Sequence, residues 1–119
     1  MKKEMRTQEQ VDRDIRTAGS GFLAFKLSDM LLRIGELENK TSKDALINDF
    51  YHNQEGYSDS DPSGTRWRVN AARRIISAGQ TIYALEKVAN SNASSEAVER
   101  AKETLHRIEI GELQLPSLE

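Results

Sequence analysis

The sequence contains no cysteine in its 119 residues. This absence excludes disulfide scaffolds, thiolate metal sites and cysteine nucleophiles together. Long apolar runs are also missing, because no stretch approaches the roughly 20 residues that a membrane-spanning helix requires. The basic segment 1–6 leads into a polar stretch and not into an apolar one, so no secretory signal is expected. We therefore expect a cytoplasmic protein without a membrane anchor.

Large apolar residues are few. Leu, Ile, Val and Phe together make up 26 of the 119 residues, just above the roughly one-fifth below which chains tend to be disordered. A chain of this length forms one domain and buries only about two-thirds of its unfolded surface. The sequence therefore predicts a single helical domain over residues 1–119 with a thin core.

Neither sign of charge dominates, since 17 basic and 19 acidic side chains leave a net charge of −2. This balance argues against a protein whose whole surface attracts polyanions. The charges are nevertheless segregated along the chain. Residues 1–40 carry +1, residues 41–62 carry −4, residues 63–91 carry +4 and residues 92–119 carry −3. One basic segment therefore lies between acidic ones.

The spacing of apolar residues predicts an all-α fold, a small bundle of about four helices. Residues 4–38 have a heptad-like apolar stripe that contains Gly19 and Gly21, which predicts either one bent helix or two. A short helix is expected after residue 40. A last helix is expected with Ser94 or Ser95 as its cap, ending near Gly111, with coil beyond it.

The longest predicted helix spans about residues 65–90 and is expected to be the centre of the bundle. Its apolar residues cover an arc of roughly 200°, which is wider than the stripe of an ordinary surface helix. Trp67 forms one edge of this arc, and Ile75 and Leu85 lie within it. The width of the arc predicts a helix that is packed on more than one side.

The heptad-like stripe and the thin core predict a homodimer, because the expected helices are short of partners for burial. Two charged residues also project into the apolar arc of helix 65–90, and antiparallel packing across a twofold axis would bring them together. Two alternatives stay open: the stripe packs on helix 65–90 within one subunit, and the two charges reach solvent at the rim of the core. The residues assigned to the dimer contact are Val11, Ile15, Ala18, Phe22, Phe25, Arg68 and Glu86.

The arc opposite the apolar face of helix 65–90 is basic and polar. It carries Arg66, Asn70, Arg73 and Arg74, which are able to form charge-assisted hydrogen bonds to phosphates. This pattern indicates a contact with nucleic acid or with a phosphoprotein. In the alternative interpretation, acidic residues of 55–61 or of the last helix neutralise the arginines.

Residues 59–64 resemble the front half of the calcium loop of EF-hand proteins, with oxygen donors at loop positions 1, 3 and 5 and glycine at position 6. The resemblance ends there, because Asn70 occupies the position of the bidentate Glu and Arg66 that of an apolar residue. We therefore expect no bound calcium, and instead a turn in which Ser63 caps the following helix.

Two acid–histidine pairs at helical spacing, Asp49 with His52 and Glu103 with His106, are similar to the motif of di-iron bundles. The 100° step of a helix turns all four side chains away from the apolar stripes, so neither a metal site nor another cofactor is expected. Because these are the only histidines, the sequence lacks a convincing set of nucleophile, base and orienting group. No enzymatic activity is expected.

These observations predict a non-enzymatic interaction or regulatory protein that acts by binding another macromolecule. The expected partner is another protein or a second copy of the chain. The alternative is a nucleic-acid-binding protein that uses the arginine-rich face of helix 65–90.

Overall fold

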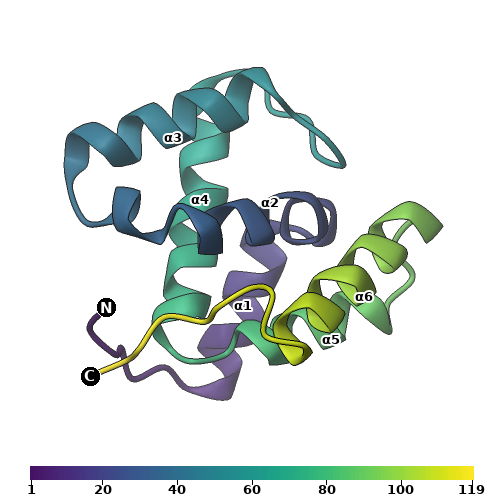
Figure 1. Cartoon of the computed structure of the whole chain (residues 1–119). Coiled ribbons are helices and arrows are strands. Elements are labelled where there is room, and N and C mark those ends of the chain that lie inside the picture. Colours follow the sequence, from purple (N-terminus) through teal and green to yellow (C-terminus); the bar gives the residue numbers. More distant parts are fainter.

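The structure, a computed structural model, describes all 119 residues and contains six α-helices, one short 3-10 helix and no strand (Figure 1). The all-α prediction is therefore confirmed, whereas the predicted count of about four helices is too low. In chain order the helices are α1 (Gln8–Ala18), α2 (Ser20–Leu32), the 3-10 helix η1 (Ile34–Leu37), α3 (Lys40–His52), α4 (Pro62–Ser77), α5 (Thr81–Ala89) and α6 (Ser95–Glu109).

Residues 4–38 form two α-helices, which resolves the choice between one bent helix and two. The break lies at Gly19, whose φ of 87° is a conformation that glycine adopts at little cost. Its backbone N–H donates to the Ile15 carbonyl and ends α1, and α2 begins at the next residue. The change of direction places α1 against α4 and sends α2 into the centre of the molecule.

The predicted helix 65–90 is two helices, which corrects the sequence interpretation. Gly79 has a φ of 72°, and its N–H donates to the Ile76 carbonyl while that of Gln80 donates to the Ile75 carbonyl. This pair of hydrogen bonds is a Schellman motif, which ends α4. The apolar periodicity runs across the break because Gly79 falls on the same arc as its neighbours, so the period alone did not reveal it.

Helix α4 begins earlier than predicted. Asp61 is its N-cap and accepts a hydrogen bond of 2.8 Å from the Ser63 backbone N–H, and Pro62 occupies the first helical position. The expectation that Ser63 caps this helix is therefore wrong. Ser94 is the cap of α6, which resolves the choice between Ser94 and Ser95, and the positive φ of Gly111 after its end agrees with the prediction.

Helix α2, and not residues 65–90, is the centre of the fold. Nine of its 13 residues are buried, and it contacts α1, α4, α5 and α6. In Figure 1 it lies between the α3–α4 pair and the α5–α6 pair. A single hydrophobic cluster of 23 buried residues joins α2 to the other helices. The scarce apolar residues thus form one continuous core.

The two ends of the chain run side by side (Figure 1). The Lys3 N–H donates to the main-chain oxygen of Glu119 at 3.0 Å, and the Glu119 N–H donates to the Met1 carbonyl at 3.3 Å. The Glu4 N–H donates to the Ser77 carbonyl, which fixes the N-terminal segment beside the end of α4. The tail after Gly111 is coil, as expected. None of the helices combines the length and the apolar character needed to cross a membrane.

Candidate macromolecular interface

Trp67 is the largest of the exposed apolar residues, and 68% of it is exposed on α4. The sequence placed it at the edge of the apolar arc. The core side of α4 is narrower than that arc and includes the small residues Ala71 and Ala72, which allow close packing. The indole therefore lies outside the core. This exposure is a feature that helical periodicity did not reveal.

Two shallow hollows adjoin at Trp67, and both also include Thr17 of α1. They lie where α1 and α4 pack together. The first is lined by charged and small polar residues, and the second by an amide and a guanidinium. The additional lining residues are Arg16, Asp59, Ser63, Gly64 and Arg68 in the first hollow, and Asn70 and Arg74 in the second.

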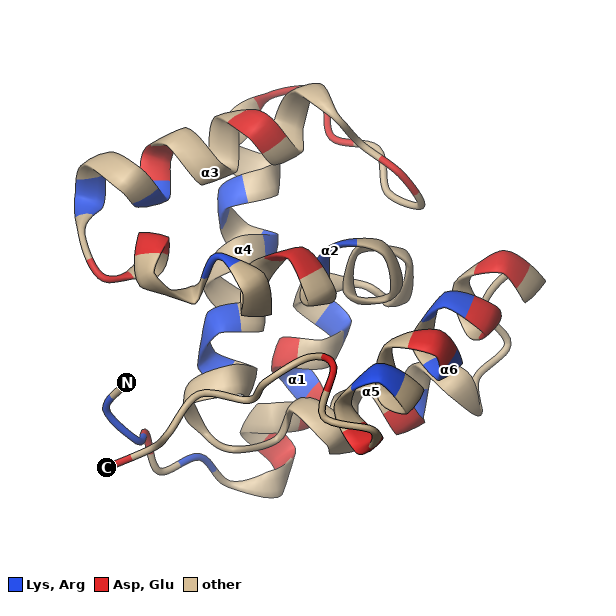
Figure 2. Ribbon diagram, in the orientation of Figure 1, with Lys and Arg blue, Asp and Glu red and all other residues tan.

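The four residues predicted to form a basic arc do share the outer side of α4. Arg66, Asn70, Arg73 and Arg74 are all partly exposed, and none belongs to the core. Figure 2 shows basic residues along the length of α4. Trp67 lies between Arg66 and Asn70 in the chain and is the one residue of this surface that the sequence interpretation missed. We call these five residues the α4 face.

Two of the three arginines on the α4 face form ion pairs. The Arg66 guanidinium donates to Asp44 of α3 at 2.8 Å, and the Arg74 guanidinium donates to Asp14 of α1 at 2.9 Å. Hydrogen bonds from Lys40 and then Arg66 lower the pKa of Asp44 below its usual value. The partners therefore come from α3 and α1, and not from residues 55–61 or the last helix as the alternative interpretation expected.

Asp14 is buried, with 2% of its side chain exposed, and it accepts hydrogen bonds from both Arg6 and Arg74. Breaking a buried ion pair by removing one partner typically costs about 3–5 kcal/mol, because a charge is left uncompensated. The carboxylate thus joins α1, α4 and the segment before α1. It also holds the Arg74 side chain in one orientation beside Trp67.

Arg73 differs from its two neighbours because it forms no ion pair. Lys43 of α3 forms none either, and its pKa is lowered by burial, then by the positive charges of Arg73 and Arg66. Arg73 also lines a hollow with Lys2 and Lys3 of the N-terminal segment. The α3 side of the α4 face therefore carries an excess of positive charge.

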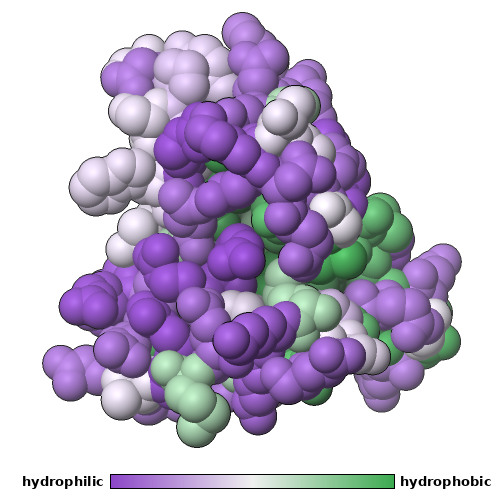
Figure 3. Space-filling view, turned by 90° about the vertical axis from the view of Figure 1, so that its left-hand side faces the viewer, coloured by the Kyte–Doolittle hydropathy of each residue, from purple (hydrophilic) through white to green (hydrophobic).

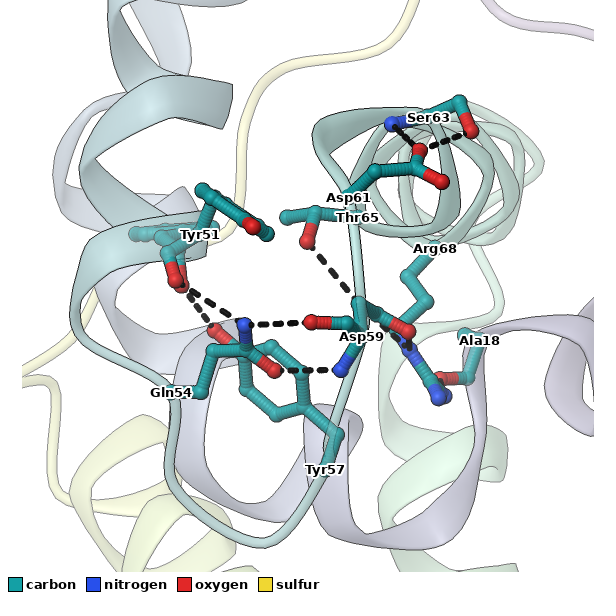
Figure 4. A network of polar contacts seen from close by, with 10 residues as sticks. Ala18, Tyr51, Gln54, Tyr57, Asp59, Asp61, Ser63, Thr65 and Arg68 are labelled. Carbon is teal, nitrogen blue, oxygen red and sulfur yellow. Dashed lines mark hydrogen bonds and ion pairs between the residues drawn. The ribbon is translucent and has the colours of Figure 1, made fainter.

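Arg68, which was assigned to the dimer contact, is engaged inside the chain (Figure 4). Its Nε donates to both carboxylate oxygens of Asp59 at 3.1 Å, and one terminal nitrogen donates to the Ala18 carbonyl at 2.8 Å. Its guanidinium also lies 5.5 Å from the centre of the Tyr57 ring. Burial, followed by the charge of Asp59, raises the pKa of Tyr57. Arg68 thus joins α4 to the 53–61 loop and to the end of α1.

The other residues assigned to the dimer contact lie inside the chain, with one exception. Val11, Ala18, Phe22 and Phe25 are buried and Ile15 packs against the core, whereas Glu86 is exposed on α5. The structure therefore follows the alternative in which the stripe packs within one subunit. A second subunit could not reach these apolar side chains without opening the core.

The residues that resemble a calcium loop are used within the fold. Asp59 accepts hydrogen bonds from Thr65 and Arg68, and Asp61 caps α4 (Figure 4). The two acid–histidine pairs, Asp49 with His52 and Glu103 with His106, are exposed on α3 and α6. No three His, Asp or Glu side chains are grouped closely enough to hold a metal ion.

The chain matches no protein-family model, no curated protein and no solved structure.

Proposed function

We propose that the protein is a non-enzymatic binding module and that it binds another macromolecule through the α4 face. The observation that carries this proposal is the exposure of Trp67 between two hollows and beside three arginines. Trp and Arg are the residue types most enriched among those that dominate binding energy at interfaces. An exposed indole brings the hydrophobic area for binding, and the guanidinium groups bring directional hydrogen bonds.

The arginines beside Trp67 are held in place before any partner arrives. Asp44 fixes Arg66 and Asp14 fixes Arg74, each by a hydrogen bond shorter than 3 Å. Side chains that are already ordered lose less conformational entropy on binding. A carboxylate that pairs with two cations leaves one net positive charge at the site, as Asp44 does with Lys40 and Arg66. The ion pairs therefore support binding as well as the fold.

The test is a Trp67→Ala variant in a capture experiment from lysate of the source cells. We expect the wild-type chain to retain a partner and the variant to lose it. Affinity should fall about 30-fold, equivalent to the loss of about 2 kcal/mol that marks a dominant interface residue. Because Trp67 is exposed, its replacement should change stability by no more than about 0.5 kcal/mol.

The matched control is Ile110→Ala, which removes another exposed large apolar side chain, 58% exposed, from the tail after α6. This variant should retain the partner. Identical capture by wild type and Trp67→Ala, with both folded by circular dichroism, would contradict the proposed function. Parallel samples treated with nuclease show whether the partner is held through nucleic acid.

Nucleic acid is the second candidate partner, and a specific observation favours it. Arg73 and Lys43 form no ion pairs on the α3 side of the α4 face, and Lys2 and Lys3 lie beside Arg73. Phosphate groups are the natural counter-ions for such a cluster.

A further inference from the structure

We propose that the α4 face binds single-stranded nucleic acid, with backbone phosphates held by Lys43, Arg73 and the Lys2–Lys3 segment and one base stacked on Trp67. This inference rests on the proposed function, because it uses the same face and assigns the chemistry of its ligand. Proteins that bind single strands commonly combine these two features, a cationic groove along the backbone and an aromatic platform for bases.

The phosphate side is a hollow in the molecule and not a set of loose surface lysines. It is lined by Lys2, Lys3, Glu4, Arg73 and Ser77. The Glu4 N–H donates to the Ser77 carbonyl at 2.9 Å, and the Ser77 hydroxyl donates to the Glu4 carboxylate at 2.7 Å. These bonds hold the two lysines near Arg73. The only acid in the hollow, Glu4, accepts the Ser77 hydrogen bond and forms no ion pair, so the hollow holds three cations and one carboxylate and carries a net positive charge.

Lys43 extends this positive region across to α3. It is half-buried and forms no ion pair, and both Arg73 and Arg66 oppose its charge. Like charges that lie close together in a partly buried site repel one another. A bound phosphate would relieve this repulsion, because it places negative charge among Lys43, Arg73 and their neighbours. The unbound face therefore holds cations that an anionic ligand would stabilise.

Trp67, the residue proposed to stack on a base, lies near enough to the cations for one nucleic-acid strand to reach both. Trp67 and Arg73 are six residues apart on α4, about 120° apart around the helix and about 9 Å apart along its axis. This length corresponds to about three stacked nucleotides at the 3.4 Å spacing of a nucleic-acid strand. A short strand that crosses the outer side of α4 obliquely can therefore contact both the indole and the cation cluster.

The surroundings of α4 favour a single strand over a duplex. An α-helix that reads duplex DNA enters the major groove and must project from the protein. Helix α1 packs along α4, and α3 reaches its other flank through the Asp44–Arg66 ion pair. The α4 face is therefore part of a broad surface, which suits an unpaired strand lying across it.

The residue types around Trp67 favour nucleic acid over a protein segment. Of the six exposed large hydrophobic residues, Trp67 is the only one on α1, α3 or α4. The side of the molecule that carries the N-terminus and the start of α3 is predominantly hydrophilic, with apolar residues gathered toward one edge (Figure 3). Protein interfaces usually have an apolar centre of several residues. A lone indole among cations matches a base-stacking platform better.

The test is fluorescence anisotropy of a labelled single-stranded oligodeoxythymidine of about 12 nucleotides, titrated with the full chain at several salt concentrations. We expect the logarithm of the association constant to fall linearly with the logarithm of the salt concentration. Trp67→Ala should weaken binding by about 5- to 150-fold, the effect of losing one base from an aromatic stack. Trp67→Phe keeps an aromatic ring and should retain most of the affinity.

The phosphate contacts are tested with the double variant Lys43→Ala/Arg73→Ala. Binding should weaken about tenfold at low salt. The slope of the logarithm of the association constant against the logarithm of salt concentration should decrease in magnitude by about 1.4, or 0.7 for each lost phosphate contact. The matched control is Lys87→Ala/Lys102→Ala, which removes two exposed lysines from α5 and α6 and so changes the net charge equally. This control should bind like the wild type.

Three results would overturn the inference. The first is no oligonucleotide binding at low salt, and the second is an equal loss in both double variants. The third is binding of polyglutamate as tightly as the oligonucleotide, which would assign the face to acidic polypeptides. If a protein partner is still lost on Trp67→Ala while the oligonucleotide does not bind, the nucleic-acid inference falls and the proposed function stands.

Discussion

Single carboxylates decide which arginines of this protein are available to a ligand. Asp14 and Asp44 each accept two cations and so hold Arg74 and Arg66 in place. Arg73 lies on the same face of the same helix but has no carboxylate within ion-pair distance. The partners of Arg66 and Arg74 are 22 and 60 residues away along the chain. Sequence spacing could therefore identify the arginines but not their neutralisation.

A third carboxylate, Asp12, connects α1 to α5 and makes stability depend on pH. It accepts a hydrogen bond of 2.7 Å from the Tyr83 hydroxyl. This bond is the main reason that the pKa of Asp12 is lowered and that of Tyr83 is raised. Because the pKa of Asp12 is lower in the folded state, its ionised form stabilises the fold above the unfolded pKa of about 4. That contribution is lost as the pH falls through the folded pKa.

Tyr83→Phe removes the hydroxyl donor and should raise the pKa of Asp12 toward its usual value. The variant should be less stable than the wild type at pH 7, and this difference should shrink at an acidic pH below the lowered pKa of folded Asp12, where the carboxyl is protonated in both proteins. Carboxyl-carbon NMR titration measures the pKa, and urea unfolding at the two pH values measures the stability. An unchanged Asp12 pKa in the variant would show that the hydrogen bond does not control it.

At the scale of the helices, glycines with positive φ set where elements end. Gly19 separates α1 from α2, and Gly79 separates α4 from α5. The sequence indicated the first break, because two glycines interrupt the apolar pattern there. It did not indicate the second break, because Gly79 is a lone glycine within an apolar arc. A glycine followed by a polar residue inside a long helical pattern is the local signal that could have revealed it.

Gly79→Ala should lower the free energy of unfolding by about 1–2 kcal/mol, because an L-residue is strained at a φ of 72°. A Cβ atom at this position would also lie 3.3 Å from Leu118 of the tail, closer than an ordinary contact. Urea unfolding monitored by circular dichroism measures the change.

The matched control is Gly35→Ala, where an added Cβ would meet nothing within 4 Å and φ is not positive. The free energy of unfolding of this variant should be unchanged or up to about 1 kcal/mol higher, because alanine restricts the unfolded chain. Equal stability changes in the two variants would contradict the role assigned to Gly79.

At the scale of the whole molecule, the thin core is concentrated around α2. Its buried residues contact four other helices, and the resulting cluster includes Ala18, Phe22 and Phe25 from the stripe that predicted a homodimer. The fold therefore uses those side chains within one chain. The homodimer stays a prediction, but it would need residues other than the apolar stripe.

Light scattering of the purified chain and of a Phe22→Leu variant tests this point. Because Phe22 is fully buried, the substitution should cost about 1–3 kcal/mol of stability in urea unfolding. The native mass should be the same for both proteins, whether it corresponds to the 13.4 kDa chain or to twice that value. A lower mass for the variant at a concentration where the wild type is dimeric would show that Phe22 contributes to the dimer contact.

The sequence by itself determined the all-α class, a serine cap of α6 at residue 94 or 95, the end of that helix before Gly111 and the basic outer side of α4. These features depend on periodicity, capping and charge within a few neighbouring residues, which a sequence displays directly. The tertiary structure decided that Trp67 is exposed, that α2 is central and that Arg73 lacks the carboxylate its neighbours have. Each of these depends on contacts between residues far apart in the chain. Such contacts exist only once the helices have packed.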